Sequence, residues 1–224
     1  MNKNKDLLSI EYKNTIAATL FFFIDYKNAI KIVDERLVPV KYFYKKSLAF
    51  ISFYDNKNSS IGSYFEIAAG IKAKTIGADK KGYYICNLPV STKKACDMGK
   101  KHWGFPKTLN NIEMKLEKKS IEVFLKNLNL KPIILFKLAS SFFKKVKSKD
   151  LTLLSIKNGD ILASMLQVEG ESFIGRCNNY QQRIFEVRHK IIETINLLNM
   201  EKKKPLFIIY SKNKRCVLSA PKKI

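Results

Sequence analysis

Short apolar runs, separated by turn signals at close intervals, are the feature that most constrains how this chain can fold. The runs are rich in β-branched and aromatic residues, a composition typical of β-strands. The strands predicted in this way cover 19–24, 48–53, 64–74, 83–88, 112–116, 121–125, 151–156, 161–168, 207–210 and 215–218. The pair Asn158-Gly159, between two of these runs, is typical of a hairpin turn. Many strands joined by tight turns predict a mainly β (α+β) fold, in which an antiparallel sheet curls towards a barrel or sandwich.

Helical patterns are short and few. Asp25 follows an apolar run and is expected to cap a short helix through Val33. Thr92 to Lys101, with Thr92 as its cap, and Lys190 to Leu198 are the other predicted helices. Lys212-Asn213-Lys214 is predicted to be a turn between the last two strands.

The chain is long enough to bury one sizeable core. Its 224 residues are 46% hydrophobic and show no internal repeat or Pro/Gly/Ser linker, so we expect a single domain over residues 1–224. The formal net charge of +23 suggests nucleic-acid binding, but only five of the 42 basic residues are arginine. Because phosphate and base recognition favours the arginine fork, we interpret the charge as a solvated lysine surface and do not expect a nucleic-acid partner.

The cysteines and the longest apolar run exclude other classes. Cys86, Cys96, Cys177 and Cys216 are widely spaced, which predicts reduced thiols in a cytoplasmic protein, with neither a disulfide framework nor a metal site. The run from Ile16 to Ile24 is too short to span a membrane and is interpreted as a buried strand. No nucleotide-binding glycine loop is present.

Two residues are candidates for chemistry. Lys107 follows the turn Trp103-Gly104-Phe105-Pro106, in which Pro106 fixes its own φ and gives the next residue a defined direction. Glu66 is an acid within an apolar strand pattern, where a carboxylate is costly unless it is paired. On local sequence alone, both residues are interpreted as solvent-facing, because lysines are abundant here and strands have an outer face.

The motif Trp103 to Lys107, together with Tyr64-Phe65-Glu66, resembles the acetoacetate decarboxylase family. The resemblance is most specific over residues 62–107. It implies a cone-like, largely antiparallel β-barrel that forms homo-oligomers and uses no cofactor. It also implies that Lys107 is the Schiff-base lysine, that Glu66 lines the same pocket, and that Leu88, Trp103 and Phe105 are its apolar walls or supports.

The chemistry implied by this resemblance is decarboxylation of a β-keto acid, acetoacetate to acetone and carbon dioxide, through a lysine imine. A dry pocket disfavours the ammonium form and would supply the neutral amine that attacks the ketone. Two alternatives stay open. The same imine could serve aldol, dehydration or cyclisation chemistry on another oxo-acid or polyketone, or the chain could be a non-catalytic binder of a small ligand or of nucleic acid.

The sequence also departs from the family pattern. The lysine that follows the nucleophile in the well-known decarboxylases is Thr108 here, and Lys101 stands where an acidic residue is expected. The position of the family's pocket arginine falls around Thr15 or Ile16. The position of its additional pocket glutamate falls around Ile51 or Ser52. Activation of Lys107 is therefore expected to come mainly from the dry pocket.

Overall fold

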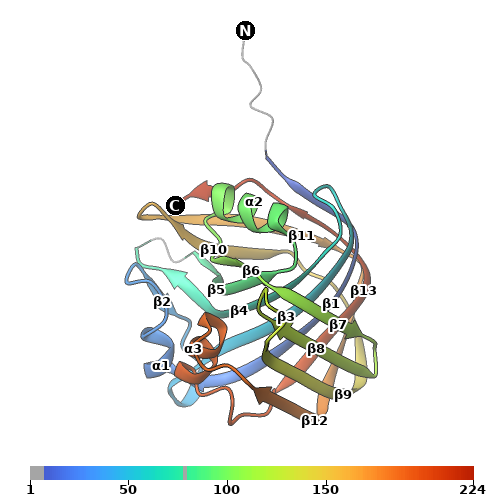
Figure 1. Ribbon diagram of the computed structural model, residues 1–224. Coiled ribbons are helices and arrows are strands. Elements are labelled where there is room, and N and C mark those ends of the chain that lie inside the picture. Colours follow the sequence, from blue (N-terminus) through green and yellow to red (C-terminus); the bar gives the residue numbers. More distant parts are fainter. Residues whose placement is uncertain (1–7, 78–79) are drawn as a thin grey trace.

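A curled, mostly antiparallel sheet forms the body of the computed structural model, which describes residues 8–77 and 80–224 (Figure 1). The strands are β1 (Ile10–Asp25), β2 (Leu37–Pro39), β3 (Lys46–Ser59), β4 (Tyr64–Thr75), β5 (Lys81–Val90), β6 (Lys107–Leu109), β7 (Asn111–Leu116), β8 (Ser120–Lys126), β9 (Pro132–Lys147), β10 (Leu151–Lys157), β11 (Asp160–Glu169), β12 (Glu171–Ile184), β13 (Phe207–Leu218) and β14 (Lys222–Lys223). The helices are α1 (Tyr26–Ile30), α2 (Lys93–Trp103) and α3 (Lys190–Leu197), and a 3-10 turn spans Phe43–Lys45.

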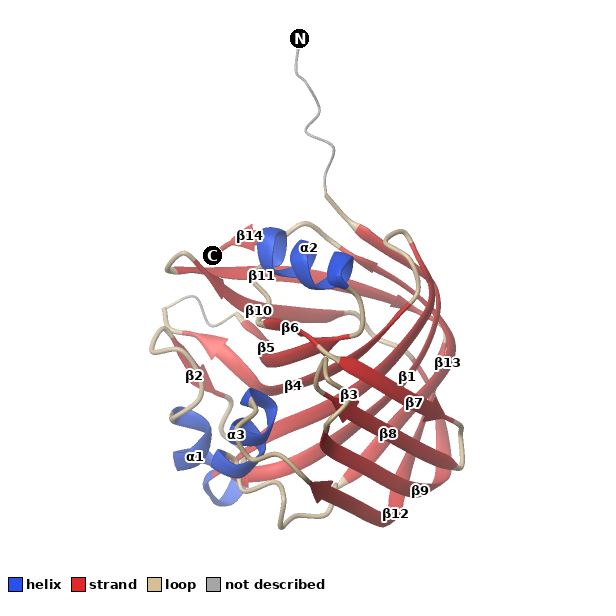
Figure 2. Cartoon of the chain, viewed as in Figure 1, coloured by secondary structure: helices blue, strands red, loops and turns tan. Residues whose placement is uncertain are grey.

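The sheet turns back on itself. Its strand order is β14-β11-β10-β5-β4-β3-β1-β13-β12-β9-β8-β7, and β11 pairs with β13 as well as with β10. This extra pairing links seven strands in a closed circuit, and β12, β9, β8 and β7 extend from it as a curved wing (Figure 2). The pairings of β5 with β6 and with β10 are parallel, and the others are antiparallel. The prediction of a mainly β, curled antiparallel fold is confirmed.

Strand β1 is buried on both faces because it separates two apolar clusters. Ile16, Ala18, Leu20 and Phe22 belong to a core that also contains α3 and the inner faces of β7, β8 and β9. The alternate positions from Thr15 to Phe21 face the space enclosed by the closed circuit. Burial on both faces explains why the run from Ile16 to Ile24 is almost continuously apolar.

Local signals were correct at two of the predicted turns and caps. Asn158 and Gly159 both have positive φ, 50° and 82°, and join β10 to β11 as the predicted hairpin. The Thr92 hydroxyl accepts the Ala95 N–H and caps α2. The prediction for Asp25 was wrong, since its carboxylate makes no cap hydrogen bond and instead accepts from the Lys46 ammonium at 2.5 Å.

Two further predictions need correction. Lys212-Asn213-Lys214 is not a turn, because β13 runs without interruption from Phe207 to Leu218 and accommodates this segment as an irregularity in its pairing with β1. Strands β9 and β12 were not predicted. The first half of β9, Ile133 to Leu138, carries a buried apolar pattern that was missed. In β12 the exposed positions are charged or amide residues, so this strand lacks the apolar pattern that marks the others.

Candidate functional site

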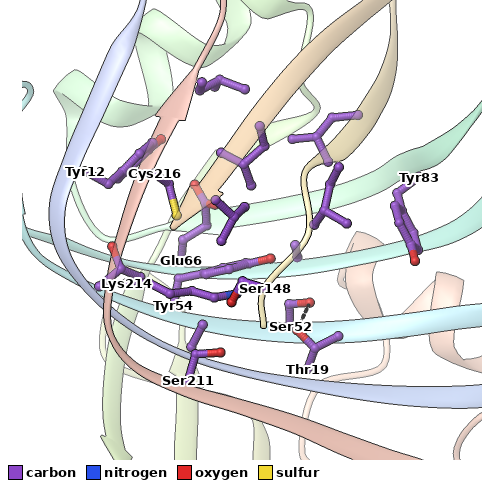
Figure 3. Close-up of a pocket in the computed structure, with 18 of the residues that line it drawn as sticks. Tyr12, Thr19, Ser52, Tyr54, Glu66, Tyr83, Ser148, Ser211, Lys214 and Cys216 are labelled. Carbon is purple, nitrogen blue, oxygen red and sulfur yellow. Dashed lines mark hydrogen bonds between the residues drawn. The ribbon is translucent and has the colours of Figure 1, made fainter. Parts of the chain in front are cut away.

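A cavity of about 480 Å³ lies inside the closed circuit of strands (Figure 3). Its walls come from β1, β3, β4, β5, β9, β10, β11, β12 and β13, and α2 and β6 also contribute residues. Most of the lining is aliphatic or aromatic, with polar groups gathered at a few positions. Pockets of this size and composition are typical of small-molecule sites.

The segment after α2 delivers Lys107 into this cavity. Gly104 ends the helix in the left-handed conformation, with φ 63°, which suits glycine. The Lys107 N–H donates to the Phe105 carbonyl at 2.8 Å, forming a tight turn around Pro106, whose restricted φ matches such a turn. Lys107 then begins β6 and pairs in parallel register with Leu88. The backbone that precedes the lysine is therefore fixed at both ends.

Lys107 and Glu66 meet inside the cavity. The Lys107 Nζ donates to the Glu66 Oε2 at 2.7 Å, and the two side chains are 4% and 14% exposed. The same Nζ lies 5.4 Å from the centre of the Tyr64 ring. The amine and the carboxylate are therefore held in direct contact within a largely apolar cavity. Glu66 is the one acidic residue among the described residues that line the cavity.

Helix α2 holds the lysine stem in place. A Cβ added at Gly99 would lie 2.5 Å from both Cδ and Cε of Lys107, so the stem occupies the space that a side chain would fill. Trp103 is fully buried, and its indole N–H donates to the Ser219 carbonyl at 2.9 Å. The Ser155 hydroxyl donates to the Trp103 carbonyl at 2.5 Å. The end of α2 is thus fastened to β10 and to the segment after β13.

Three tyrosines surround the pair. The hydroxyls of Tyr12 and Tyr64 lie 3.1 Å apart, and burial, with the Glu66 charge as a smaller contribution, raises the pKa of both phenols. Burial also raises the pKa of Tyr54 to about 12. These phenols therefore stay protonated near neutral pH, where they can donate hydrogen bonds but cannot act as bases.

The other predicted site residues lie as follows. Leu88, Trp103 and Phe105 line the cavity with Lys107 and Glu66. Thr15 and Ser52 also line it and place neutral hydroxyls there, whereas Ile16 and Ile51 belong to the opposite core. Thr108 bonds to Asn110 through its hydroxyl, and Lys101 lies on the exposed side of α2, so neither lines the cavity.

Sequence reasoning missed several polar groups of the cavity. Tyr12 and Tyr54 were not proposed because they read as ordinary strand residues. Lys214 was assigned to a turn, yet it points into the cavity from β13 (Figure 3). A strand-pairing irregularity decides which residues of β13 face inwards, and no local sequence signal marks it.

Neither a metal cluster nor a spanning helix is found in the part of the chain that the structure describes. No group of three or more His, Cys, Asp and Glu residues in 8–77 and 80–224 could hold a metal ion. No helix within these ranges is long and apolar enough to cross a membrane. All four cysteines are free.

Comparison with known proteins identifies the family. The sequence model of acetoacetate decarboxylase (ADC) matches residues 5–138, a range that includes both Glu66 and Lys107. This chain belongs to the acetoacetate decarboxylase family. No curated protein matches it.

Solved structures share the fold of this chain. The acetoacetate decarboxylase of Legionella pneumophila has a TM-score of 0.73 at 15% identity, with 97% of this chain and 88% of that chain covered. An acetoacetate decarboxylase-like enzyme from Sphingomonas wittichii has a TM-score of 0.67 at 11% identity and coverages of 98% and 94%. The enduracididine biosynthesis enzyme MppR, complexed with pyruvate, has a TM-score of 0.67 at 10% identity and coverages of 96% and 89%. The identities are low, so these likenesses establish the fold alone.

Proposed function

We propose that the protein is a Schiff-base-forming lyase that decarboxylates a β-keto acid through an imine at Lys107. The observation that carries this proposal is the buried Lys107 amine, 2.7 Å from the Glu66 carboxylate in an apolar cavity. Membership of the acetoacetate decarboxylase family supports it, because the match spans both residues.

The contact between the two side chains suits the first step. Glu66 is placed to accept a proton from Lys107, because Nζ and Oε2 are 2.7 Å apart, and this transfer leaves the amine neutral for attack. The amine nitrogen attacks the ketone carbon. The carbinolamine then loses water after its hydroxyl is protonated by Glu66, and a protonated imine remains.

The imine acts as the electron sink for decarboxylation. The bond between the α-carbon and the carboxylate carbon breaks, its electron pair moves to form the enamine, and carbon dioxide leaves. A proton then adds to the α-carbon, and water hydrolyses the imine to release the ketone and the free amine of Lys107. Protonated Tyr54 and Tyr12 are available to orient the substrate oxygens by donating hydrogen bonds.

The test is carbon dioxide release from acetoacetate by matched lysine variants. Lys107→Arg keeps the positive charge beside Glu66 but cannot form an imine, so release should fall to the uncatalysed rate. Lys126→Arg is the control, because Lys126 also pairs with a glutamate, Glu113, at 2.6 Å but does not line the cavity. Undiminished release by Lys107→Arg would remove Lys107 from the mechanism.

A second candidate is imine chemistry without decarboxylation, such as condensation of an oxo-acid. It is favoured by the absence of arginine among the described residues that line the cavity and by a solved relative, MppR, bound to a condensation product of pyruvate and an aldehyde. Borohydride trapping of pyruvate on Lys107, with no carbon dioxide released from acetoacetate, would favour this candidate over the first.

A further inference from the structure

A bulge in β13 decides which of its side chains enter the cavity. Between the pairs Ala17↔Ser211 and Thr15↔Lys214, β13 advances three residues while β1 advances two. The extra residue adjoins Asn213, whose φ is 57°. A bulge of this kind shifts the alternation of the strand by one position.

The β13 residues that line the cavity reflect this shift. Before the bulge, Ile209 and Ser211 face inwards, and after it Lys214, Cys216 and Leu218 do so. With regular alternation, positions 213 and 215 would face inwards and Lys214 would point away. The bulge therefore places a lysine in a largely apolar cavity, which is costly unless a ligand or another group compensates.

Lys214 has no acidic partner among the described residues. No ion pair or hydrogen bond is found for its ammonium, and burial lowers the pKa of Lys214, with only a minor opposing effect from Cys216. Glu66, the acid of the cavity, is already in contact with Lys107. Lys107 and Lys214 thus differ, since the Lys107 amine contacts a carboxylate and the Lys214 amine is available to an incoming anion.

A chain of serine hydroxyls lies on the same side of the cavity. Ser148 and Ser172 are 2.9 Å apart, Ser172 and Ser211 are 2.7 Å apart, and all three line the cavity. The two hydrogen bonds use two of the three serine hydroxyl protons, so the third hydroxyl proton can be donated to a ligand. Figure 3 shows the Lys214 side chain extending from β13 towards Ser148.

We propose that Lys214, assisted by this serine chain, binds the carboxylate of the keto-acid substrate while its ketone reacts at Lys107. The proposal rests on the proposed function for the position of the ketone. Strand β4, which carries Glu66, is separated from β13 by β3 and β1, which is three interstrand steps of about 4.8 Å each. Lys107 starts from β6, which pairs with β5, and Lys214 starts from β13, and both side chains line the same cavity. Lys214 is thus a positioning and specificity-determining residue.

The experiment compares acetoacetate with its neutral methyl ester. The readout is the imine at Lys107 trapped by borohydride, because the ester cannot release carbon dioxide. Wild-type protein should reach half-maximal trapping with the acid at a concentration about ten- to a hundredfold lower than with the ester, the factor of one charge-assisted hydrogen bond. Lys214→Met keeps the aliphatic stem and should remove this preference by raising the half-maximal concentration for the acid, while the half-maximal concentration for the ester stays within threefold of wild type. Lys214→Arg should restore part of it. Lys212→Met, on an exposed residue of the same strand, is the matched control.

The outcomes separate this proposal from the function on which it rests. Borohydride adducts at Lys107 with both compounds, together with an undiminished preference for the acid in Lys214→Met, would overturn the role of Lys214. Adducts on Lys214 itself would overturn it as well, because that lysine would then be the nucleophile. If neither compound gives an adduct, the proposed function fails, and calorimetric binding of acetoacetate to wild type and Lys214→Met still decides whether Lys214 holds the carboxylate.

Discussion

Replacing Gly99 with alanine should displace the Lys107 amine while leaving the fold intact. The new Cβ would lie 2.5 Å from Cδ and Cε of Lys107, and ordinary contact begins at 3.4 Å, so the stem must retreat by about 1 Å. The stem is 4% exposed and enclosed by the cavity wall, so it cannot swing into solvent. A misplacement of this size costs about a hundredfold in rate.

The stability change should be small because two effects oppose each other. Alanine favours a helix over glycine by about 1 kcal/mol, and overpacking costs about 1–3 kcal/mol. The assay is carbon dioxide release from acetoacetate together with a thermal melt, and Lys100→Ala on the exposed side of α2 is the control. A Gly99→Ala protein that keeps a rate within threefold of wild type would refute the claim that α2 fixes the lysine.

Three further predictions follow from particular contacts. Glu66→Gln removes the group that accepts the proton of Lys107, so carbon dioxide release should fall by about 10²- to 10⁴-fold at neutral pH. Burial lowers the pKa of His189, which caps α3 as a neutral acceptor, so the unfolded chain binds the proton more tightly and the melting temperature should fall as pH drops below about 6.5. His189→Asn should remove about 2–4 °C of that fall, because asparagine accepts at every pH. Trp103→Phe loses the bond to Ser219 and should destabilise the protein by about 1–3 kcal/mol in urea unfolding.

Each of these has an outcome that contradicts it. Unchanged release by Glu66→Gln would exclude the carboxylate as the proton acceptor, provided that circular dichroism shows a folded protein. Parallel pH curves of melting temperature for wild type and His189→Asn would show that the cap does not titrate. A Trp103→Phe protein as stable as wild type would mean that the indole hydrogen bond contributes nothing net.

Much of the site could be predicted because two segments resemble the acetoacetate decarboxylase family, whereas local sequence alone wrongly predicted that Lys107 and Glu66 face solvent. The turn from Trp103 to Lys107 is a contiguous motif, and Glu66 stands out as a charge in an apolar strand. The structure brings the two side chains into contact across β4, β5 and β6. Local patterns also gave the curled antiparallel sheet and the hairpin at Asn158.

The rest depends on pairing between distant strands. Lys214 enters the cavity only because β13 gains one residue against β1, and a segment rich in Lys and Asn is indistinguishable from a turn until its partner strand is known. The serine chain likewise joins residues from three separate segments, 148, 172 and 211. Strand β12 escaped prediction because its polar sequence becomes a strand only through its pairing with β9, whereas the apolar run Ile133 to Leu138 of β9 was a local signal that was missed.

The central claim is that Lys107 forms an imine with a keto acid. Borohydride reduction in the presence of acetoacetate, followed by intact-mass measurement and peptide mapping, tests it most directly. The account predicts one added substrate-derived group, located on the peptide that contains Lys107 and absent from Lys107→Arg. An unchanged intact mass, or an adduct that maps to another lysine, would contradict it.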